Sequence, residues 1–421
     1  MSVFSQKLIP DEIRKVVIER TEKGLYDQII IGVISGDNTE FLVQNNDENH
    51  LLNEQSPVNA SSLLPFFLSF QLYESISKGV LNPLAPLNDY LPKEVKLKDK
   101  SDKKSKFIHA VLHGIHPQNF PELLYEQGYN IFNIDKESVY ENLKTYSLAV
   151  KHGSYYEQTP FSLQLMMSLM SDITHIKPDV YLNNLFESRH LVNSFVAKSQ
   201  VREYMELPGL VRKTELKDYF YGAVYISPED LLTLIRQNIL GKEGSDYRKL
   251  LAGNDFWFPA YSDHFKTGFA LNALLTDRDM ICFQQGNYLG HQFFFAFDTF
   301  ARKAVVVYSA SGFPADDIGF YLMGQQKELY TLGDADSSEI RVKISGEYYS
   351  DGENGLTIVR KDQDYYLYWG TVGGFLIQAL HKNEYVSIFP GIQFHFSMDE
   401  NEEVILKVVE RNGKVKYYNK K

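Results

Sequence analysis

Short runs in which apolar and polar residues alternate fill the last part of the chain, and they restrict its fold more than any other pattern. Seven such runs follow one another between residues 336 and 421, from "EIRVKISGEYYS" to "VILKVVER", with no helical stretch between them. Alternation with a period of two is typical of strands that bury one face. The pattern therefore predicts a small antiparallel β-sheet or barrel over residues 336–421.

The preceding residues mix helical and strand patterns. An amphipathic helix is expected between Pro10 and Gly24, and a hairpin follows around the turn at residues 35–38. "FSLQLMMSLMSDI" reads as a core helix, and Ser227 with Pro228 marks the start of another. From about residue 256 the runs are strand-like again. This order predicts an α+β main domain over residues 1–335, an antiparallel sheet flanked by helices, with an all-helical subdomain at about 82–225.

Composition excludes several classes of protein. The net charge of −11 over 421 residues disfavours a nucleic-acid-binding surface, which needs a basic face. The single cysteine, Cys282, cannot form an intrachain disulfide. No run approaches the ~20 apolar residues of a membrane span, and residues 1–17 lack the apolar core of a secretory signal. We therefore expect a cytoplasmic protein with no membrane or nucleic-acid partner, and no motif calls for a metal or cofactor.

The stretch "ASSLLPFFLSFQLYESISKGVL", residues 60–81, predicts a buried helix from about Ser62 to Lys78 that stops at Gly79. Two readings of its serine pair stay open. Ser61 and Ser62 suit a helix N-cap, with Pro65 in the first turn. A serine at the start of a buried apolar helix also suits a nucleophile.

Several segments, taken in order, resemble motifs of the serine β-lactamase-like and penicillin-binding-protein-like family, in particular its class C β-lactamase, esterase and D-amino-peptidase branch. "KGVLNPLAPLNDYLP" resembles the end of the first-motif helix, and counting back along it places the family's nucleophile on Ser62. "HGSYYEQTPFSLQLM" resembles the second motif and sets Tyr156 and Gln158 on its tyrosine and asparagine. The resemblance covers nearly the whole chain and implies a β-lactamase/transpeptidase-like fold.

The third motif has two candidate positions. "QQGNYLGHQFFFAFD" resembles the family's cleft strand, which places Gln284-Gln285-Gly286 on the motif and His291 beside the cleft. Lys266-Thr267-Gly268 reproduces the motif literally, earlier in the chain. The family's Gly-x-x-Gly and Val-Val-Val landmarks come later in the chain and favour Gln284-Gln285-Gly286. The choice between the two strands stays open.

The resemblance also implies a mechanism, and the sequence departs from it. In the family, a lysine one helical turn after the serine takes its proton, the tyrosine relays protons, and backbone N–H groups hold the oxyanion. Here the lysine position is Pro65, and Gln284 stands where the third motif carries a cation. The usual Ser-Lys-Tyr mechanism is therefore not supported.

Three hypotheses for the function follow. The leading one is a catalytically silent or strongly altered homologue that keeps a cleft for a small-molecule or peptide-like ligand. The second is a rewired serine hydrolase or acyltransferase that uses Ser62 and Tyr156. The third is a self-associating structural module, which leaves a homo-oligomer open. The candidate cleft residues are Ser61, Pro65, Gln158, Gln284, Gln285, Gly286 and His291.

Overall fold

The computed structural model divides the chain into two compact units, Met1–Gly312 and Phe313–Lys421. This division falls before the boundary expected at residue 336, and the second unit includes helix α10 (Asp316–Leu322). The structure describes residues 7–46, 51–96, 106–107, 136–145, 160–197, 224–241, 257–259, 265–268, 270–276, 280–288, 291–310, 315–325, 329, 343–350, 355–361, 364–369, 372–381, 384–387, 393–401, 403–409 and 415–420.

An antiparallel sheet forms the centre of the first unit, with strand order β2-β1-β11-β10-β9-β8-β7-β6. The expected hairpin is confirmed, because β1 and β2 pair along their whole length and Gly36 in the turn has a φ of 59°. The strands are β1 (Gln28–Ser35), β2 (Asn38–Asn45), β6 (Trp257–Pro259), β7 (Phe265–Gly268), β8 (Asn272–Leu275), β9 (Met280–Tyr288), β10 (His291–Asp298) and β11 (Lys303–Ala310).

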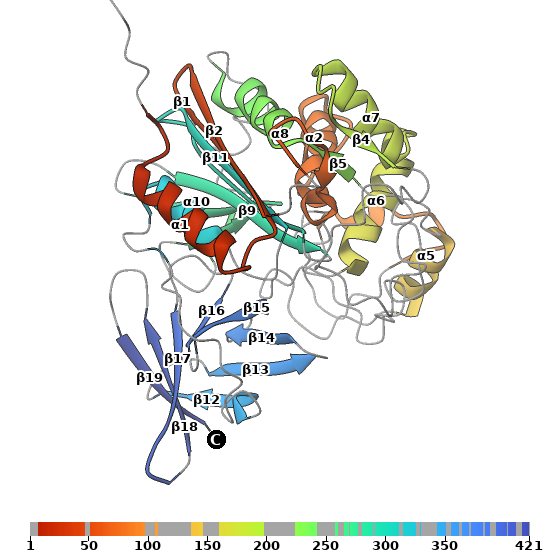
Figure 1. Cartoon of the computed structure of the whole chain (residues 1–421). Helices are drawn as coiled ribbons and strands as arrows, with labels where there is room; N and C mark the ends of the chain where they lie inside the picture. The colour runs from red at the N-terminus through yellow and green to blue at the C-terminus, as the bar shows by residue number, and fades with distance from the viewer. Residues whose placement is uncertain are drawn as a thin grey trace, which may run out of the picture. The chain divides into compact units, whose positions relative to one another are not determined.

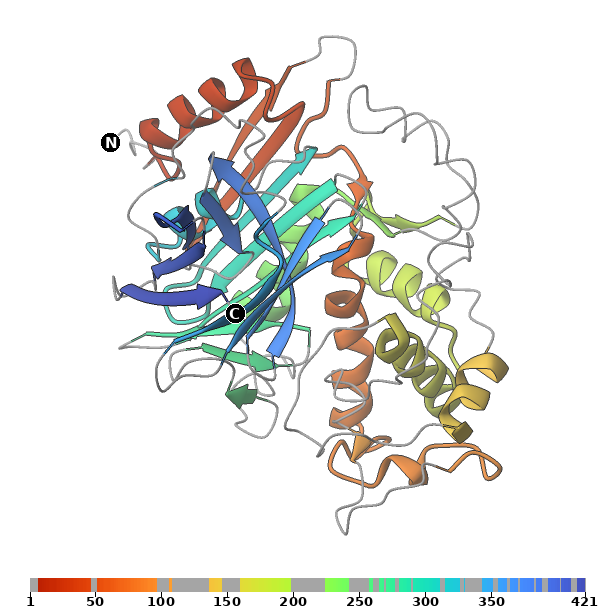
Figure 2. The same ribbon diagram turned by 90° about the horizontal axis from the view of Figure 1, so that it is seen from below.

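The two faces of this sheet carry different helices (Figure 1). Helices α2 (Leu64–Ser77) and α8 (Pro228–Ile235) cover one face, which we call the α2 face. Phe66 of α2 lies 4.5 Å, ring centroid to centroid, from Phe295 of β10 on this face. Helix α1 (Asp11–Glu22) lies on the opposite face, as the view from below also shows (Figure 2). Because side chains alternate along a strand, each strand residue belongs to one face only.

Helix α2 confirms the helix expected over residues 62–78. The chain enters it through a 3-10 turn, η1 (Ser61–Leu63), and leaves it at Gly79, whose φ is 70°. Phe66 and Phe67 are fully buried, and each such side chain contributes about 1.5–3 kcal/mol by its burial. The helix is buried on all sides from Leu64 to Tyr73 because the sheet and other helices surround it.

The remaining helices of the first unit form a layer beside α2. Tyr140 and Lys136 of α5 both bind the carboxylate of Asp172 on α6, which fixes the two helices together. Ser227 accepts a hydrogen bond from the backbone N–H of Asp230 at 3.0 Å, so the expected N-cap of α8 is confirmed. The helices are α5 (Lys136–Thr145), α6 (Pro160–Thr174) and α7 (Pro178–Ser188), and a π-helical turn, η4 (Arg236–Leu240), extends α8.

A small second sheet supports the start of α2. Its order is β3-β5-β4, and all its strands are antiparallel. The strands are β3 (Val58–Asn59), β4 (Phe195–Val196) and β5 (Val224–Ile226). Because β3 ends two residues before Ser61, the pairing of β3 with β5 fixes where η1 begins.

Strands β12 to β19 of the second unit form a closed antiparallel barrel, which decides between the sheet and the barrel expected there. Inward side chains such as Tyr348, Phe394 and Tyr418 are fully buried. Eight strands enclose a space that side chains can fill. The strands are β12 (Gly346–Tyr349), β13 (Leu356–Lys361), β14 (Asp364–Trp369), β15 (Val372–His381), β16 (Glu384–Ser387), β17 (Gln393–Met398), β18 (Val404–Val409) and β19 (Val415–Lys420).

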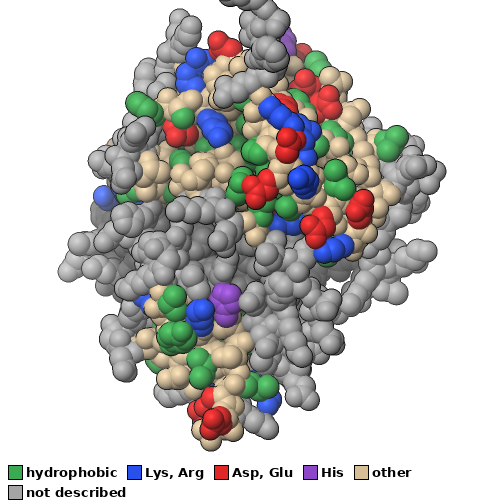
Figure 3. Space-filling view, turned by 60° about the vertical axis from the view of Figure 1, so that its left-hand side comes forward, with side chains coloured by type: hydrophobic (Ala, Val, Ile, Leu, Met, Phe, Trp, Pro, Cys, Tyr) green, Lys and Arg blue, Asp and Glu red, His purple; other side chains and the backbone are tan. Residues whose placement is uncertain are grey.

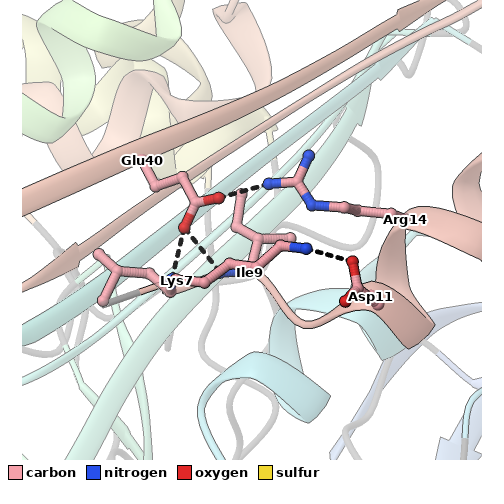
Figure 4. Close-up of polar contacts among 6 residues, drawn as sticks. Lys7, Ile9, Asp11, Arg14 and Glu40 are labelled. Atoms are coloured by element: carbon pink, nitrogen blue, oxygen red, sulfur yellow. Dashed lines mark hydrogen bonds and ion pairs between the residues drawn. The ribbon is translucent and has the colours of Figure 1, made fainter. Parts of the chain in front are cut away.

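A carboxylate on the outermost strand β2 holds the segment that leads into α1. Glu40 accepts hydrogen bonds from the backbone N–H groups of Leu8 and Ile9 and from the guanidinium of Arg14 (Figure 4). These contacts tie the chain before α1, and α1 itself, to the sheet edge. On the described part of the face drawn in Figure 3, acidic and basic side chains are interspersed.

Candidate functional site

Ser62 lies against Gly286, and this contact defines the candidate site. A Cβ atom added to Gly286 would lie 2.3 Å from the Cβ of Ser62 and 2.5 Å from its Oγ. Gly286 belongs to β9 and Ser62 to η1, so the first-motif helix starts directly above this strand. Only glycine permits so close an approach. The Oγ of Ser62 is buried, and no described residue forms a hydrogen bond with it.

Ser61 has a different role from its neighbour. Its Oγ accepts a hydrogen bond from the backbone N–H of Val224 at 3.2 Å, and its own N–H donates to the side chain of Asn59 at 3.0 Å. Helix α2 has no side-chain cap among its hydrogen bonds, and its N-cap residue is Leu63. The N-cap reading of Ser61 and Ser62 is therefore wrong, because the inserted 3-10 turn moves both serines away from the cap position. Ser61 fastens η1 to β5.

Pro65 is buried in the first turn of α2. A residue there needs no intrahelical partner for its backbone N–H, so a proline fits without loss of a helix hydrogen bond. Its position one turn after Ser62 is the position at which the resemblance expects the lysine. Pro65 carries no group that can accept a proton.

Residues 284–286 divide between the two faces of the sheet. Gln284 is 5% exposed and lies on the same face as Gly286, two residues away. Its Oε1 accepts a hydrogen bond from Asn272 Nδ2 at 3.4 Å. Gln285 lies on the opposite face, which excludes its side chain from the site at Ser62. Of the three expected third-motif residues, the structure therefore brings Gln284 and Gly286 to the side of Ser62.

His291 lies on the α2 face at the start of β10, where its backbone pairs with that of Tyr288 on the adjacent strand β9. Its Nδ1 is 2.9 Å from the hydroxyl oxygen of Tyr308 on β11. Burial lowers the pKa of His291 to about 4, so the imidazole is neutral at neutral pH. Burial, and then the nearby Tyr225, raise the pKa of Tyr308, which keeps its hydroxyl protonated. Gly286, Phe293 and Tyr308 form one row of cross-strand partners under η1.

The other expected residues lie elsewhere. Lys266-Thr267-Gly268 is on β7, which β8 separates from β9. The strand that meets Ser62 is therefore the one that carries Gly286. Tyr156 and Gln158 lie outside the described residues.

Comparison with known proteins identifies the fold. A penicillin-binding protein homologue from Pyrococcus abyssi, described as octameric, is 13% identical, with a TM-score of 0.61 over 98% of this chain and 99% of its own. A β-lactamase/D-alanine carboxypeptidase from Yersinia pestis, in complex with citrate, is 15% identical, with a TM-score of 0.60 over 75% of this chain and 96% of its own. A class C β-lactamase from Rhodobacter sphaeroides is 16% identical, with a TM-score of 0.57 over 75% and 98%. This chain has a penicillin-binding-protein-like fold.

The sequence matches no family model and no curated protein. The fold is therefore assigned from structural similarity, and sequence identities of 13–16% to these proteins show the fold alone. It agrees with the resemblance seen in the sequence and with the expected α+β class. Within the described part of the chain, no helix is long and apolar enough to cross a membrane, and no cluster of ligating side chains could hold a metal ion.

Sequence reasoning missed two residues of the candidate site. Asn272 binds Gln284 from the neighbouring strand, and Tyr308 binds His291 from the strand on the other side. Neither residue is itself part of one of the three motifs. The alternation of β11 marks Tyr308 as facing α2, but only the strand order shows that His291 lies beside it.

Proposed function

We propose that this chain is a catalytically silent or strongly altered relative of the penicillin-binding proteins, whose site at Ser62 binds a small-molecule or peptide-like ligand. One observation carries the proposal: the Oγ of Ser62 is buried without a hydrogen-bond partner among the described residues, and the residue one turn on is Pro65. A serine hydroxyl attacks only when a neighbouring base takes its proton. The family mechanism lacks that base here.

The packing of Ser62 supports the same reading. Its side chain lies over the backbone of Gly286, and the Oγ is closed off from solvent. A nucleophile has to approach the reacting carbon to about 3–3.5 Å. In this conformation Ser62 would have to rotate before it could make such an approach.

The alternative is a rewired serine hydrolase or acyltransferase that uses Ser62 and Tyr156. The His291–Tyr308 pair favours it, because a neutral imidazole on the same sheet face as Gly286 is able to accept a proton. In this alternative, backbone N–H groups near Gly286 would hold the developing oxyanion.

Acylation by mechanism-based probes separates the two functions. We expect no covalent adduct, by intact-protein mass spectrometry, after incubation with a fluorophosphonate or with benzylpenicillin. An adduct that persists in Ser61→Ala and disappears in Ser62→Ala would overturn the silent reading and establish the alternative. Pro65→Lys restores a base one turn after the serine, and a gain of adduct in that variant would show that the missing base is what silences the site.

Self-association is a further candidate function, and it rests on one comparison. The Pyrococcus abyssi homologue, which is similar over 98% of this chain, is described as octameric. Light scattering coupled to gel filtration tests it. A single species at the monomer mass of 48.5 kDa, unchanged at high protein concentration, would reject a structural role based on self-association.

A further inference from the structure

The polar side chains that the structure describes near Ser62 on the α2 face are uncharged. Ser62 offers a hydroxyl, and Gln284 offers a carboxamide whose oxygen is already bound by Asn272, which leaves the NH2 group as the donor. His291 is neutral, and its Nδ1 is engaged by Tyr308. These described side chains therefore offer hydrogen bonds but no formal charge.

The three strands β9, β10 and β11 also supply no cation on this face within their described residues. On β9, β10 and β11, the residues of the α2 face are those an even number of positions from Gly286, Phe293 and Tyr308. Among the described residues of these strands, none of that face is lysine or arginine. The members of that face whose side chains the structure describes are Met280, Cys282, Gln284, Gly286, His291, Phe293, Phe295, Phe297, Ala304, Val306, Tyr308 and Ala310.

This composition has an energetic consequence for a ligand. A carboxylate that leaves water for a buried site needs a cation or several charge-assisted hydrogen bonds, and without them its transfer is strongly unfavourable. A neutral carbonyl needs only one or two donors. A hydroxyl and an amide NH2 are donors of that kind.

We propose that the ligand bound at Ser62 is an uncharged acyl compound, an amide or an ester, and that the site rejects an analogue that carries a carboxylate. The proposal rests on the binding function proposed above and names the chemical class of its ligand. Gln284 is the residue that determines this preference, because it is buried two residues from Gly286 on the same face and offers an amide N–H but no charge.

Two ligands that differ in one group test the proposal. N-acetyl-D-alanyl-D-alanine and its C-terminal carboxamide would be titrated against the full chain by ligand-observed NMR at low millimolar concentration. We expect the carboxamide to bind at least about tenfold more tightly than the acid, as for loss of a charged partner from a buried site. Equal affinities, or tighter binding of the acid, would overturn the inference while the binding function stands. Binding of neither compound would overturn the binding function and the inference together.

A matched pair of variants on one strand locates the effect. Gln284→Lys places a cation on the α2 face and is expected to raise the affinity for the acid about tenfold or more. Gln285→Lys adds the same charge on the other face of β9 and is expected to leave both affinities unchanged. Similar responses to the two variants would overturn the role of Gln284. Circular dichroism checks that each variant folds, and the comparison of the two ligands on the unmodified chain decides the ligand class even where a variant does not fold.

Discussion

Ser62 and Gly286 are separated by so little space that a single methyl group on Gly286 would overlap both the Cβ and the Oγ of Ser62, at 2.3 and 2.5 Å. The first-motif helix therefore reaches the sheet only because β9 has a glycine at this point. The same contact directs the hydroxyl of Ser62 toward the strand.

The Gly286 contact predicts the effect of enlarging that residue. Gly286→Ala is expected to lower the free energy of unfolding by about 1–3 kcal/mol, because η1 has to move away from β9. Combining it with Ser62→Gly, which removes the overlapping side-chain atoms, should recover much of the loss. Urea denaturation of the double-mutant cycle measures the coupling, and strictly additive effects would show that the two residues are not in contact.

The same substitution, serine to alanine, should change the stability of the fold in opposite directions at Ser61 and Ser62. Ser62→Ala removes a buried hydroxyl that no described residue binds, so it is expected to stabilise the fold by about 1 kcal/mol. Ser61→Ala removes the acceptor of the Val224 N–H and is expected to destabilise the fold by about 1 kcal/mol. Thermal unfolding of the two variants checks the sign. A loss of stability in Ser62→Ala would mean that its hydroxyl has a structural partner.

The burial of His291 predicts a dependence of stability on pH. The unfolded chain binds a proton at this residue below pH 6.5, whereas the folded pKa is about 4. As the pH falls through this range, the unfolded state gains protons first, so stability is lost, by about 3 kcal/mol at full effect. His291→Asn should reduce this part of the pH dependence, and His175→Asn, at an exposed position, should leave it intact. Identical pH profiles for the parent and His291→Asn would reject the buried neutral imidazole.

The Glu40 contacts predict that one carboxylate holds the start of the chain in place. Glu40→Ala is expected to cost about 1.5–3 kcal/mol, because it leaves two backbone N–H groups and a guanidinium without their acceptor. Hydrogen exchange at Leu8 and Ile9 should accelerate in this variant. Glu22→Ala, at an exposed position on α1, serves as the control and should change neither property.

Two histidines occupy a backbone conformation that favours glycine. His175 follows α6 and His190 follows α7, and each has a φ of 57°. A left-handed conformation costs an L-residue about 1–2 kcal/mol, so His175→Gly and His190→Gly are each expected to stabilise the fold by about 1 kcal/mol. Gly79→Ala, at the corresponding position after α2, should have the opposite sign. A fall in melting temperature for both histidine variants would contradict this assignment.

Sequence patterns predicted most of the elements because each element obeys a local rule. The N-cap at Ser227, the stop at Gly79 and the hairpin turn at Gly36 depend on residues within a few positions of one another. Alternation of apolar and polar residues also predicted the strands of the barrel. It could not show whether these strands form a closed barrel or an open sheet.

The site was less accessible to sequence reasoning because it depends on pairings between distant segments. The 3-10 turn that separates Ser61 and Ser62 from the cap of α2 arises from the pairing of β3 with β5, which no local pattern encodes. The side chain of Gln285 could be excluded from the site only once the structure showed on which face of the sheet Ser62 lies. The partners of Gln284 and His291 required the strand order of the sheet.

The hydrogen bond between Ser61 and Val224 joins residues 163 positions apart in the chain. A ribosome releases the N-terminal segment first, so α2 is synthesised long before the strand that fixes its entry. During that interval its apolar sides have no sheet to cover them, since β9, β10 and β11 follow later still. A nascent chain stopped before residue 224 is therefore expected to expose this helix and to depend on chaperones, and the site at Ser62 is among the last parts of the first unit to form.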